Sequence, residues 1–251
     1  MDTNKNSYTI IYSIVMVVLV AAVLAIVATG LKERQQQNID MEKQSSILAS
    51  VNLTKGADEA DSKIEFYNNL YNKYIKAVTV DVNGQVMESV DAFKVDLAAQ
   101  SKIIAKAASL EGQAKLDALK NVKLPVFQCN LNGEMVNIFP VYGPGLWGPI
   151  WGYVAVESDN NTIYGATFDH KGETPGLGAE IATAWFQEQF KGKQLFAEGT
   201  FSSVIVAKGG AAEGSTNEVD AISGGTITSK SLEKAIRSWI ELYIPYMNSL
   251  K

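Results

Sequence analysis

The chain has 251 residues, of which 47% are hydrophobic and 20% are charged, and its formal net charge is -5. This composition suits one ordinary globular domain plus a small appendage, and the acidic balance without a basic patch argues against nucleic acid as a partner. Because Cys129 and His170 are the only residues of their types, an internal disulfide is excluded, and any redox cofactor held by this chain alone must be organic or carboxylate-bound.

The first predicted element is a membrane-spanning helix, since no charged residue occurs from 10 to 30. About twenty helical residues at ~1.5 Å each span the ~30 Å core of a bilayer. Tyr8 and Tyr12 lie at one end of this run, and Lys32 and Arg34 at the other, as suits the two interfaces. A cleaved signal peptide is the alternative, but its apolar core is usually only ~7–15 residues and its start is more basic. Charge alone does not set the orientation.

A polar stretch follows the apolar run. Residues 32–46 contain no glycine or proline, which predicts that the helix continues into water, and residues 52–61 are typical of a linker. We therefore expect a transmembrane anchor over 1–31, a juxtamembrane helix and linker over 32–62, and a globular domain over 63–251.

The domain has the pattern of an α+β fold built on an antiparallel sheet with flanking helices. Helical spacing predicts helices over 64–75, 97–122, 179–190 and 229–246. Strand patterns occupy 77–82, 126–131, 135–141, 151–157, 162–168 and 201–207. Asn132-Gly133 favours a tight hairpin turn. Cys129 lies in one apolar strand and is expected to be a buried small hydrophobe.

Three glycine-rich loops are the candidates for function, and they cover residues 142–149, 172–178 and 223–228. Glycine lets backbone N–H groups approach a ligand closely and tolerates positive φ. Taken singly, each loop is explained as a turn. Three such loops in one small domain, two of them opening helices, favour a shared anion or cofactor site.

Familiar catalytic signatures are missing. The sequence has neither a P-loop nor a Gly-x-Gly-x-x-Gly between strand and helix, and no Gly-x-Ser-x-Gly elbow. Asp169, His170 and Glu173 lie close in sequence and are candidates for metal or acid–base roles, but His170-Lys171-Gly172 is more typical of an exposed turn tip. We predict no catalytic side chain and no metal site. A stand-alone hydrolase is not favoured, because the sequence shows no nucleophile–base pair.

The glycine motifs resemble those of a known family. Asp220 followed by Ser223-Gly224-Gly225-Thr226 resembles the sequence to which FMN is joined through its phosphate in one group of membrane electron carriers. The order Gly-Pro-Gly-Leu-Trp (143–147), Glu-Thr-Pro-Gly-Leu-Gly (173–178) and Ser-Gly-x-Thr resembles the C subunit of the bacterial sodium-translocating NADH:quinone reductase over nearly the whole chain. The G subunit of the Rnf complexes shares the second and third motifs, and the intact Gly145-Leu146-Trp147 favours the first family.

The resemblance implies a set of cofactor-binding residues. It places FMN as a phosphoester on Thr226, installed by a separate magnesium-dependent flavin transferase, with Gly225 standing where the family has alanine. Thr228 and Ser229 are candidate helix caps and hydrogen-bond donors. The other residues expected around the flavin are Ser223, Gly224, Glu173, Thr174, Gly176, Leu177, Gly178, Leu146 and Trp147.

The same resemblance implies an electron-transfer protein in a bacterial inner membrane. The N-terminus would lie in the cytoplasm and the FMN domain in the periplasm, and electrons would pass through the flavin between neighbouring membrane subunits. The implied partners are those subunits, the flavin transferase and the lipid bilayer. Two alternatives stay open at this point: the Rnf-type G subunit, and a membrane-anchored binding domain that carries no flavin.

Overall fold

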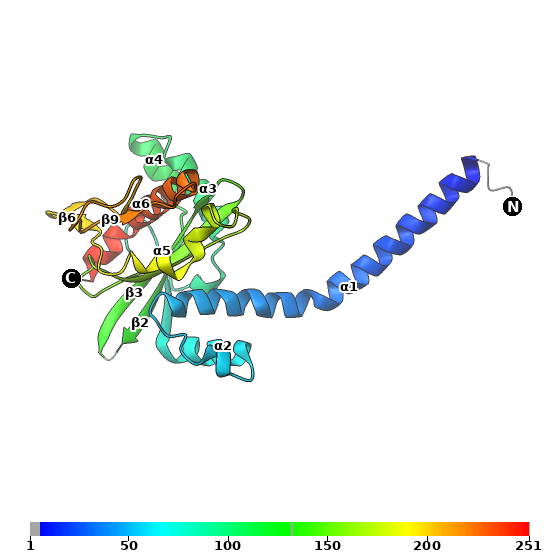
Figure 1. Ribbon diagram of the computed structural model, residues 1–251, viewed down its shortest axis with the longest axis horizontal. Helices are drawn as coiled ribbons and strands as arrows, with labels where there is room; N and C mark the ends of the chain where they lie inside the picture. Colours follow the sequence, from blue (N-terminus) through cyan, green and yellow to red (C-terminus); the bar gives the residue numbers. More distant parts are fainter. Residues whose placement is uncertain (1–5, 132, 251) are drawn as a thin grey trace. The chain divides into compact units, whose positions relative to one another are not determined.

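The computed structural model describes residues 6–131 and 133–250. The chain divides into two units, Met1–Lys43 and Gln44–Lys251. The first unit consists of most of helix α1 (Asn6–Ala49), whose apolar window reaches a mean hydropathy of 3.1 with none of its residues buried (Figure 1). Among the described residues, α1 is the one helix long and apolar enough to cross a membrane. It is compatible with a membrane anchor, and it runs unbroken through the polar stretch as predicted.

The second unit begins with the last turns of α1. Ile47, Leu48 and Val51 are almost completely buried in it. The Thr167 hydroxyl donates to the Ser46 carbonyl at 3.0 Å, which ties this segment to the sheet. The compact unit therefore starts at Gln44, while the division of the chain at residues 31 and 62 stays a prediction.

A five-stranded antiparallel sheet forms the centre of the second unit, and its strand order follows the chain. The strands are β1 (Ile75–Val80), β2 (Leu124–Leu131), β3 (Glu134–Pro144), β4 (Pro149–Val156) and β5 (Ile163–His170). The predicted hairpin joins β2 to β3 at Gly133, whose φ is 98°; Asn132 lies outside the described residues. Cys129 is fully buried in β2 as predicted, and burial raises the pKa of its thiol to about 11. The α+β class with an antiparallel sheet is confirmed.

The two faces of the sheet are covered by different helices. Helix α6 (Thr226–Ser249) packs on one face, where the rings of Tyr243 and Phe139 lie 4.7 Å apart. On the opposite face Tyr71 of α2 (Lys63–Tyr74) contacts Phe127 of β2. The remaining α-helices are α3 (Leu97–Ala107), α4 (Gly112–Leu119) and α5 (Ala184–Glu188). Short 3₁₀ turns occupy η1 (Ala57–Glu59), η2 (Ala92–Lys94) and η3 (Gly178–Ala182). The core lies between the sheet and α6.

Several predicted elements were wrong in their boundaries. The expected helix over 97–122 is broken before Gly112, which has a φ of 55°. The expected helix over 179–190 is a 3₁₀ turn followed by the five-residue α5. The expected strand over 201–207 is interrupted at Ser203, where φ is 61°. Its parts are β7 (Thr200–Phe201), paired with β6 (Phe196–Ala197), and β8 (Ile205–Ala207), paired in parallel with β9 (Glu218–Asp220).

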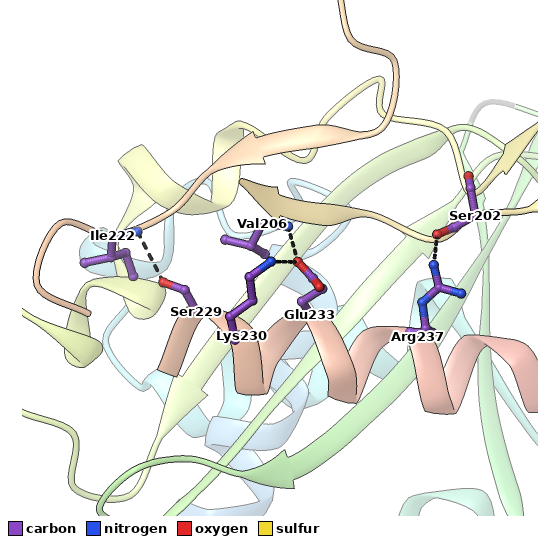
Figure 2. Close-up of polar contacts among 7 residues, drawn as sticks. All are labelled: Ser202, Val206, Ile222, Ser229, Lys230, Glu233 and Arg237. Atoms are coloured by element: carbon purple, nitrogen blue, oxygen red, sulfur yellow. Dashed lines mark hydrogen bonds and ion pairs between the residues drawn. The ribbon is translucent and has the colours of Figure 1, made fainter. Parts of the chain in front are cut away.

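Polar side chains of α6 hold β8 and the loop after β9 against the helix (Figure 2). The Glu233 carboxylate accepts from the Val206 backbone N–H at 2.6 Å and from the Lys230 ammonium at 2.8 Å. The Arg237 guanidinium donates to the Ser202 carbonyl. The Ile222 N–H donates to the Ser229 hydroxyl at 3.2 Å, so the loop that precedes α6 is fixed to the first turns of that helix.

We expect Glu233→Ala to lower the free energy of unfolding by about 1–3 kcal/mol, because it leaves the N–H of the buried Val206 without an acceptor. Lys230→Ala removes only the exposed ion pair with Glu233 and should cost about 0–1 kcal/mol. Urea unfolding of the full-length variants in detergent measures both changes. Equal losses of stability in the two variants would show that the hydrogen bond from the Val206 N–H to Glu233 is not what stabilises the packing of β8 on α6.

Candidate functional site

The three glycine-rich loops meet around one cavity of about 440 Å³. The cavity is lined by Leu146, Trp147, Glu173, Thr174, Leu177, Gly178, Gly224, Gly225, Thr226, Ile227 and Thr228. Two residues proposed from the sequence are not part of this lining: Gly176 lies in an exposed turn with φ 74°, and Ser223 is exposed next to the cavity-lining Gly224. Ile227 lines the cavity and was not singled out from the sequence.

A larger hollow of about 780 Å³ lies at another place, bordered by Asn160, Glu198 and Ile244. It contains none of the residues that the motifs indicated. We place the candidate site in the smaller cavity because the three loops converge there, and volume alone does not identify a site.

The first loop connects β3 to β4 as a tight turn. The N–H of Gly145 donates to the carbonyl of Gly148 at 2.7 Å, and Pro144 and Pro149 face each other across the strands. The turn leaves Leu146 and Trp147 at its tip, where they are 47% and 70% exposed. Both side chains line the cavity, so this tip gives the cavity one apolar wall.

The second loop connects β5 to η3. The carbonyl of Thr174 accepts from the N–H groups of Leu177 at 3.1 Å and Ala179 at 3.2 Å, which curls the loop back on itself. Leu177 is 41% exposed, whereas Gly178 is buried. Leu177 therefore adds a second apolar wall.

The third loop is a turn closed by a hydrogen bond from the Gly225 N–H to the Ile222 carbonyl at 3.0 Å. Gly224 has φ 74° and lies so close to Leu177 that a Cβ atom would be 2.5 Å from Cδ2 of that side chain. Gly225 has φ -101°, which alanine also adopts, but a Cβ there would lie 2.9 Å from Cγ2 of Ile222. Glycine at 225 thus serves close packing, and alanine would require Ile222 to shift.

Helix α6 begins at Thr226, three residues earlier than the predicted start at residue 229. Its N-cap is Gly225, no side chain caps the helix, and its first turn holds no acidic residue. The prediction of Thr228 or Ser229 as a cap was wrong, because the Thr228 hydroxyl donates to Glu173 and the Ser229 hydroxyl accepts from Ile222. The N–H groups of an uncapped first turn are suited to binding an anion.

Glu173 lies at the centre of the three loops and is 4% exposed. Its carboxylate accepts from the Thr228 hydroxyl at 2.5 Å and from the Trp147 N–H at 2.9 Å. Burial alone would raise the pKa of Glu173. The hydrogen bonds from Thr228 and from the N–H groups of Trp147 and Leu146, with help from His170, outweigh burial and hold this pKa below its usual value.

Asp169 and His170 accept hydrogen bonds within the turn that leads to Glu173. The Glu173 N–H donates to Nδ1 of His170 at 3.1 Å, and the His170 N–H donates to the Asp169 carboxylate at 2.7 Å. Within the described ranges no three His, Cys, Asp or Glu side chains group closely enough to hold a metal ion.

Acid is expected to destabilise the domain through Glu173. Because its pKa is lower in the folded than in the unfolded chain, the ionised carboxylate stabilises the fold above the ordinary Glu pKa of ~4.3, and this stabilisation is lost as pH falls through the lowered folded value. Glu173→Gln, which has no proton to take up, should lose less thermal stability than the wild type between about pH 7 and about pH 3. Parallel melting-temperature curves for the two proteins would contradict this.

The two threonines at the start of α6 have different environments. Thr226 is partly exposed and lines the cavity, whereas Thr228 is 1% exposed and its hydroxyl proton is donated to Glu173. The lining contains no lysine or arginine. An anion bound here would therefore depend on backbone N–H groups and on the helix dipole, with the Thr226 hydroxyl beside it.

Comparison with known proteins gives consistent matches. The FMN-binding domain family matches residues 145–241, which include every site residue that the sequence indicated. The C subunit of the Na(+)-translocating NADH-quinone reductase of Vibrio anguillarum is 32% identical over 245 residues, covering 96% of this chain and 93% of the relative. The same subunit of Neisseria meningitidis is 29% identical over 259 residues, covering 100% and 96% of the two chains.

Solved structures match as well. The crystal structure of the C subunit of the Na(+)-translocating NADH-quinone reductase from Parabacteroides distasonis is 40% identical, with a TM-score of 0.70 and coverage of 86% of this chain and 96% of that one. The crystal structure of Shewanella oneidensis NqrC is 29% identical, with a TM-score of 0.66 and coverage of 84% and 97%.

Proposed function

The chain belongs to the family of the C subunits of Na(+)-translocating NADH-quinone reductases, and we propose that it carries FMN covalently on Thr226 and passes electrons through this flavin between neighbouring subunits. As a member of this family it is part of an oxidoreductase complex and has an FMN-binding domain. One observation carries the covalent assignment: Thr226 opens an uncapped helix at the edge of the cavity, with its side chain partly exposed.

Thr226 would supply the ester oxygen. Its Oγ1–P bond forms as a P–O bond of a pyrophosphate-linked flavin dinucleotide breaks, the second nucleotide leaves, and the threonine proton passes to a base of the flavin transferase. The N–H groups of the first turn of α6 then stabilise the single negative charge left on the phosphodiester. Gly224 and Gly225 let the turn that carries Thr226 pack closely on Leu177 and Ile222.

The apolar residues around the cavity would hold the flavin ring. Leu146, Trp147 and Leu177 come from two loops and are each more than 40% exposed, so they would provide apolar contact area for a flat ring. Flavin supplies one-electron and two-electron chemistry when it is bound, and the chain's task is to position it and exclude water. Thr174 lines the same cavity and is placed to donate a hydrogen bond.

Helix α1 would anchor the protein in a bacterial inner membrane, with the FMN-binding domain in the periplasm and residues 1–31, 32–62 and 63–251 as anchor, connecting segment and domain. The other subunits of the reductase would be its redox partners, and a flavin transferase would modify it. The relatives and solved structures are those of the sodium-translocating reductase, so the Rnf-type alternative is set aside. Sodium transport belongs to the whole complex.

The test is chemical analysis of the polypeptide extracted from membranes of cells that also make a flavin transferase. Flavin fluorescence should survive a denaturing gel, and the peptide containing residues 223–229 should carry the mass of FMN less one water. A colourless protein with an unmodified peptide would leave the remaining alternative, an anchored binding domain without covalent flavin.

A further inference from the structure

The Glu173 carboxylate bridges the three loops of the site through two hydrogen bonds. Its Oε1 atom accepts from the Trp147 N–H of the first loop at 2.9 Å, and its Oε2 atom accepts from the Thr228 hydroxyl at the start of α6 at 2.5 Å. Glu173 itself belongs to the second loop. These two contacts join segments that are 26 and 55 residues away in the sequence, so the carboxylate links parts of the chain that local structure does not connect.

Two glycines provide the space in which this carboxylate lies. A Cβ atom on Gly145 would lie 2.6 Å from Oε1 of Glu173, and one on Gly178 would lie 2.5 Å from Oε2 and collide with the Thr228 hydroxyl as well. Any other residue at either position would displace the carboxylate. The glycines of the first two loops therefore serve the contact with Glu173 in addition to leaving room for a ligand.

Among the residues that the structure describes, no cation neutralises this buried carboxylate by direct contact. Within residues 6–131 and 133–250 the recorded salt bridges do not include Glu173. A buried charge without an ion pair depends on its hydrogen-bond donors, and hydrogen bonds to an ionised acceptor are about twice as strong as neutral ones. The first loop and the start of α6 therefore each donate a hydrogen bond to the same side chain of the second loop.

We propose that Glu173 is the positioning residue of the site: by binding Trp147 and Thr228 it fixes the three loops in one arrangement, in which the Thr226 hydroxyl is presented to the flavin transferase. The effect of Glu173 on flavin attachment rests on the proposed function, whereas its effect on the arrangement of the loops does not. The residue acts through the loops and takes no part in forming the ester bond.

The first experiment measures the loops in the absence of flavin. In the full-length chain made without a transferase, Glu173→Ala should raise amide hydrogen exchange in residues 143–149 and 223–229 by at least about tenfold, the lower end expected for the loss of a hydrogen bond to a charged group. Glu180→Ala is the matched control, since that carboxylate of η3 accepts from the nearby Gly176 N–H, at 3.0 Å, and the substitution should leave both segments unchanged. Unchanged exchange in Glu173→Ala overturns the proposal.

The second experiment measures the initial rate of flavin attachment. Glu173→Ala and Thr228→Val should each slow attachment by roughly tenfold or more, and the double variant should be no slower than the worse single variant, because the two residues act as one unit. Glu173→Gln should recover most of the rate, since an amide can accept from Trp147 and donate to Thr228. Effects that multiply in the double variant, or a Gln variant as slow as the Ala variant, overturn the proposal.

The two experiments separate the possible failures. Thr228→Val keeps the carboxylate and the side-chain volume, so it remains informative if Glu173→Ala fails to fold, as circular dichroism would reveal. An unlabelled wild type would refute the proposed covalent function, while the exchange measurement would still decide whether Glu173 holds the loops.

Discussion

Thr226→Val is expected to remove covalent flavin completely. Valine keeps the volume and the β-branched shape of threonine, so the first turn of α6 and the cavity should be preserved, but no oxygen remains to form the ester. The variant should show no fluorescent band on a denaturing gel under ultraviolet light, and the peptide of residues 223–229 should have its unmodified mass. Its circular dichroism spectrum and melting temperature should match those of flavin-free wild type.

Two controls locate the attachment point. Ser223→Ala removes an exposed hydroxyl that does not line the cavity, and the flavin that this variant carries should still be on Thr226. Thr228→Val should be labelled more slowly, but still on Thr226, because the hydroxyl of Thr228 is buried and donates to Glu173. Flavin that persists in Thr226→Val and disappears in Thr228→Val would move the ester two residues along the helix.

The sheet could be predicted from the sequence because its signals are local. Apolar and β-branched runs mark the strands, the turn residues Asn132-Gly133 mark one hairpin, and each strand pairs with its neighbour in strand order. The start of α6 was missed because Gly-Gly-Thr-Ile-Thr has low helix propensity, with two glycines and three β-branched residues. Tertiary contacts, such as the Ile222 N–H to Ser229 hydroxyl bond, hold that turn.

The convergence of the three loops was predicted, but not what connects them. The motifs indicated that residues near 146, 174 and 226 share a site, and the cavity lining contains residues from all three regions. The sequence does not reveal that Glu173 binds Thr228, because a contact across 55 residues has no local pattern. For the same reason the sequence does not distinguish a glycine that has a positive φ, such as Gly224, from one that leaves space for neighbouring side chains, such as Gly178.

Trp239→Ala is expected to be the most destabilising of the substitutions considered. Trp239 is 1% exposed between α6 and the sheet, and its indole N–H donates to the Tyr142 carbonyl at 2.6 Å. Truncating a buried aromatic side chain of this size costs about 3–5 kcal/mol. The Tyr142 carbonyl also loses the shorter of its two side-chain hydrogen bonds and keeps the one from the Ser101 hydroxyl at 3.4 Å. Trp185→Ala is the matched control: this tryptophan is 58% exposed, and its loss should change stability by no more than about 0.5 kcal/mol.

The position of Trp239 gives this substitution a second consequence. Tyr142 opens the loop that carries Leu146 and Trp147, and α6 carries Thr226 at its first position. The Trp239–Tyr142 contact therefore fixes the helix that bears the attachment point against the strand that bears the apolar wall. Urea unfolding should show the loss of stability, and flavin attachment should slow under conditions in which the variant is still folded. Normal attachment to a strongly destabilised Trp239→Ala protein would mean that the loops themselves hold the site, independently of how α6 packs on β3.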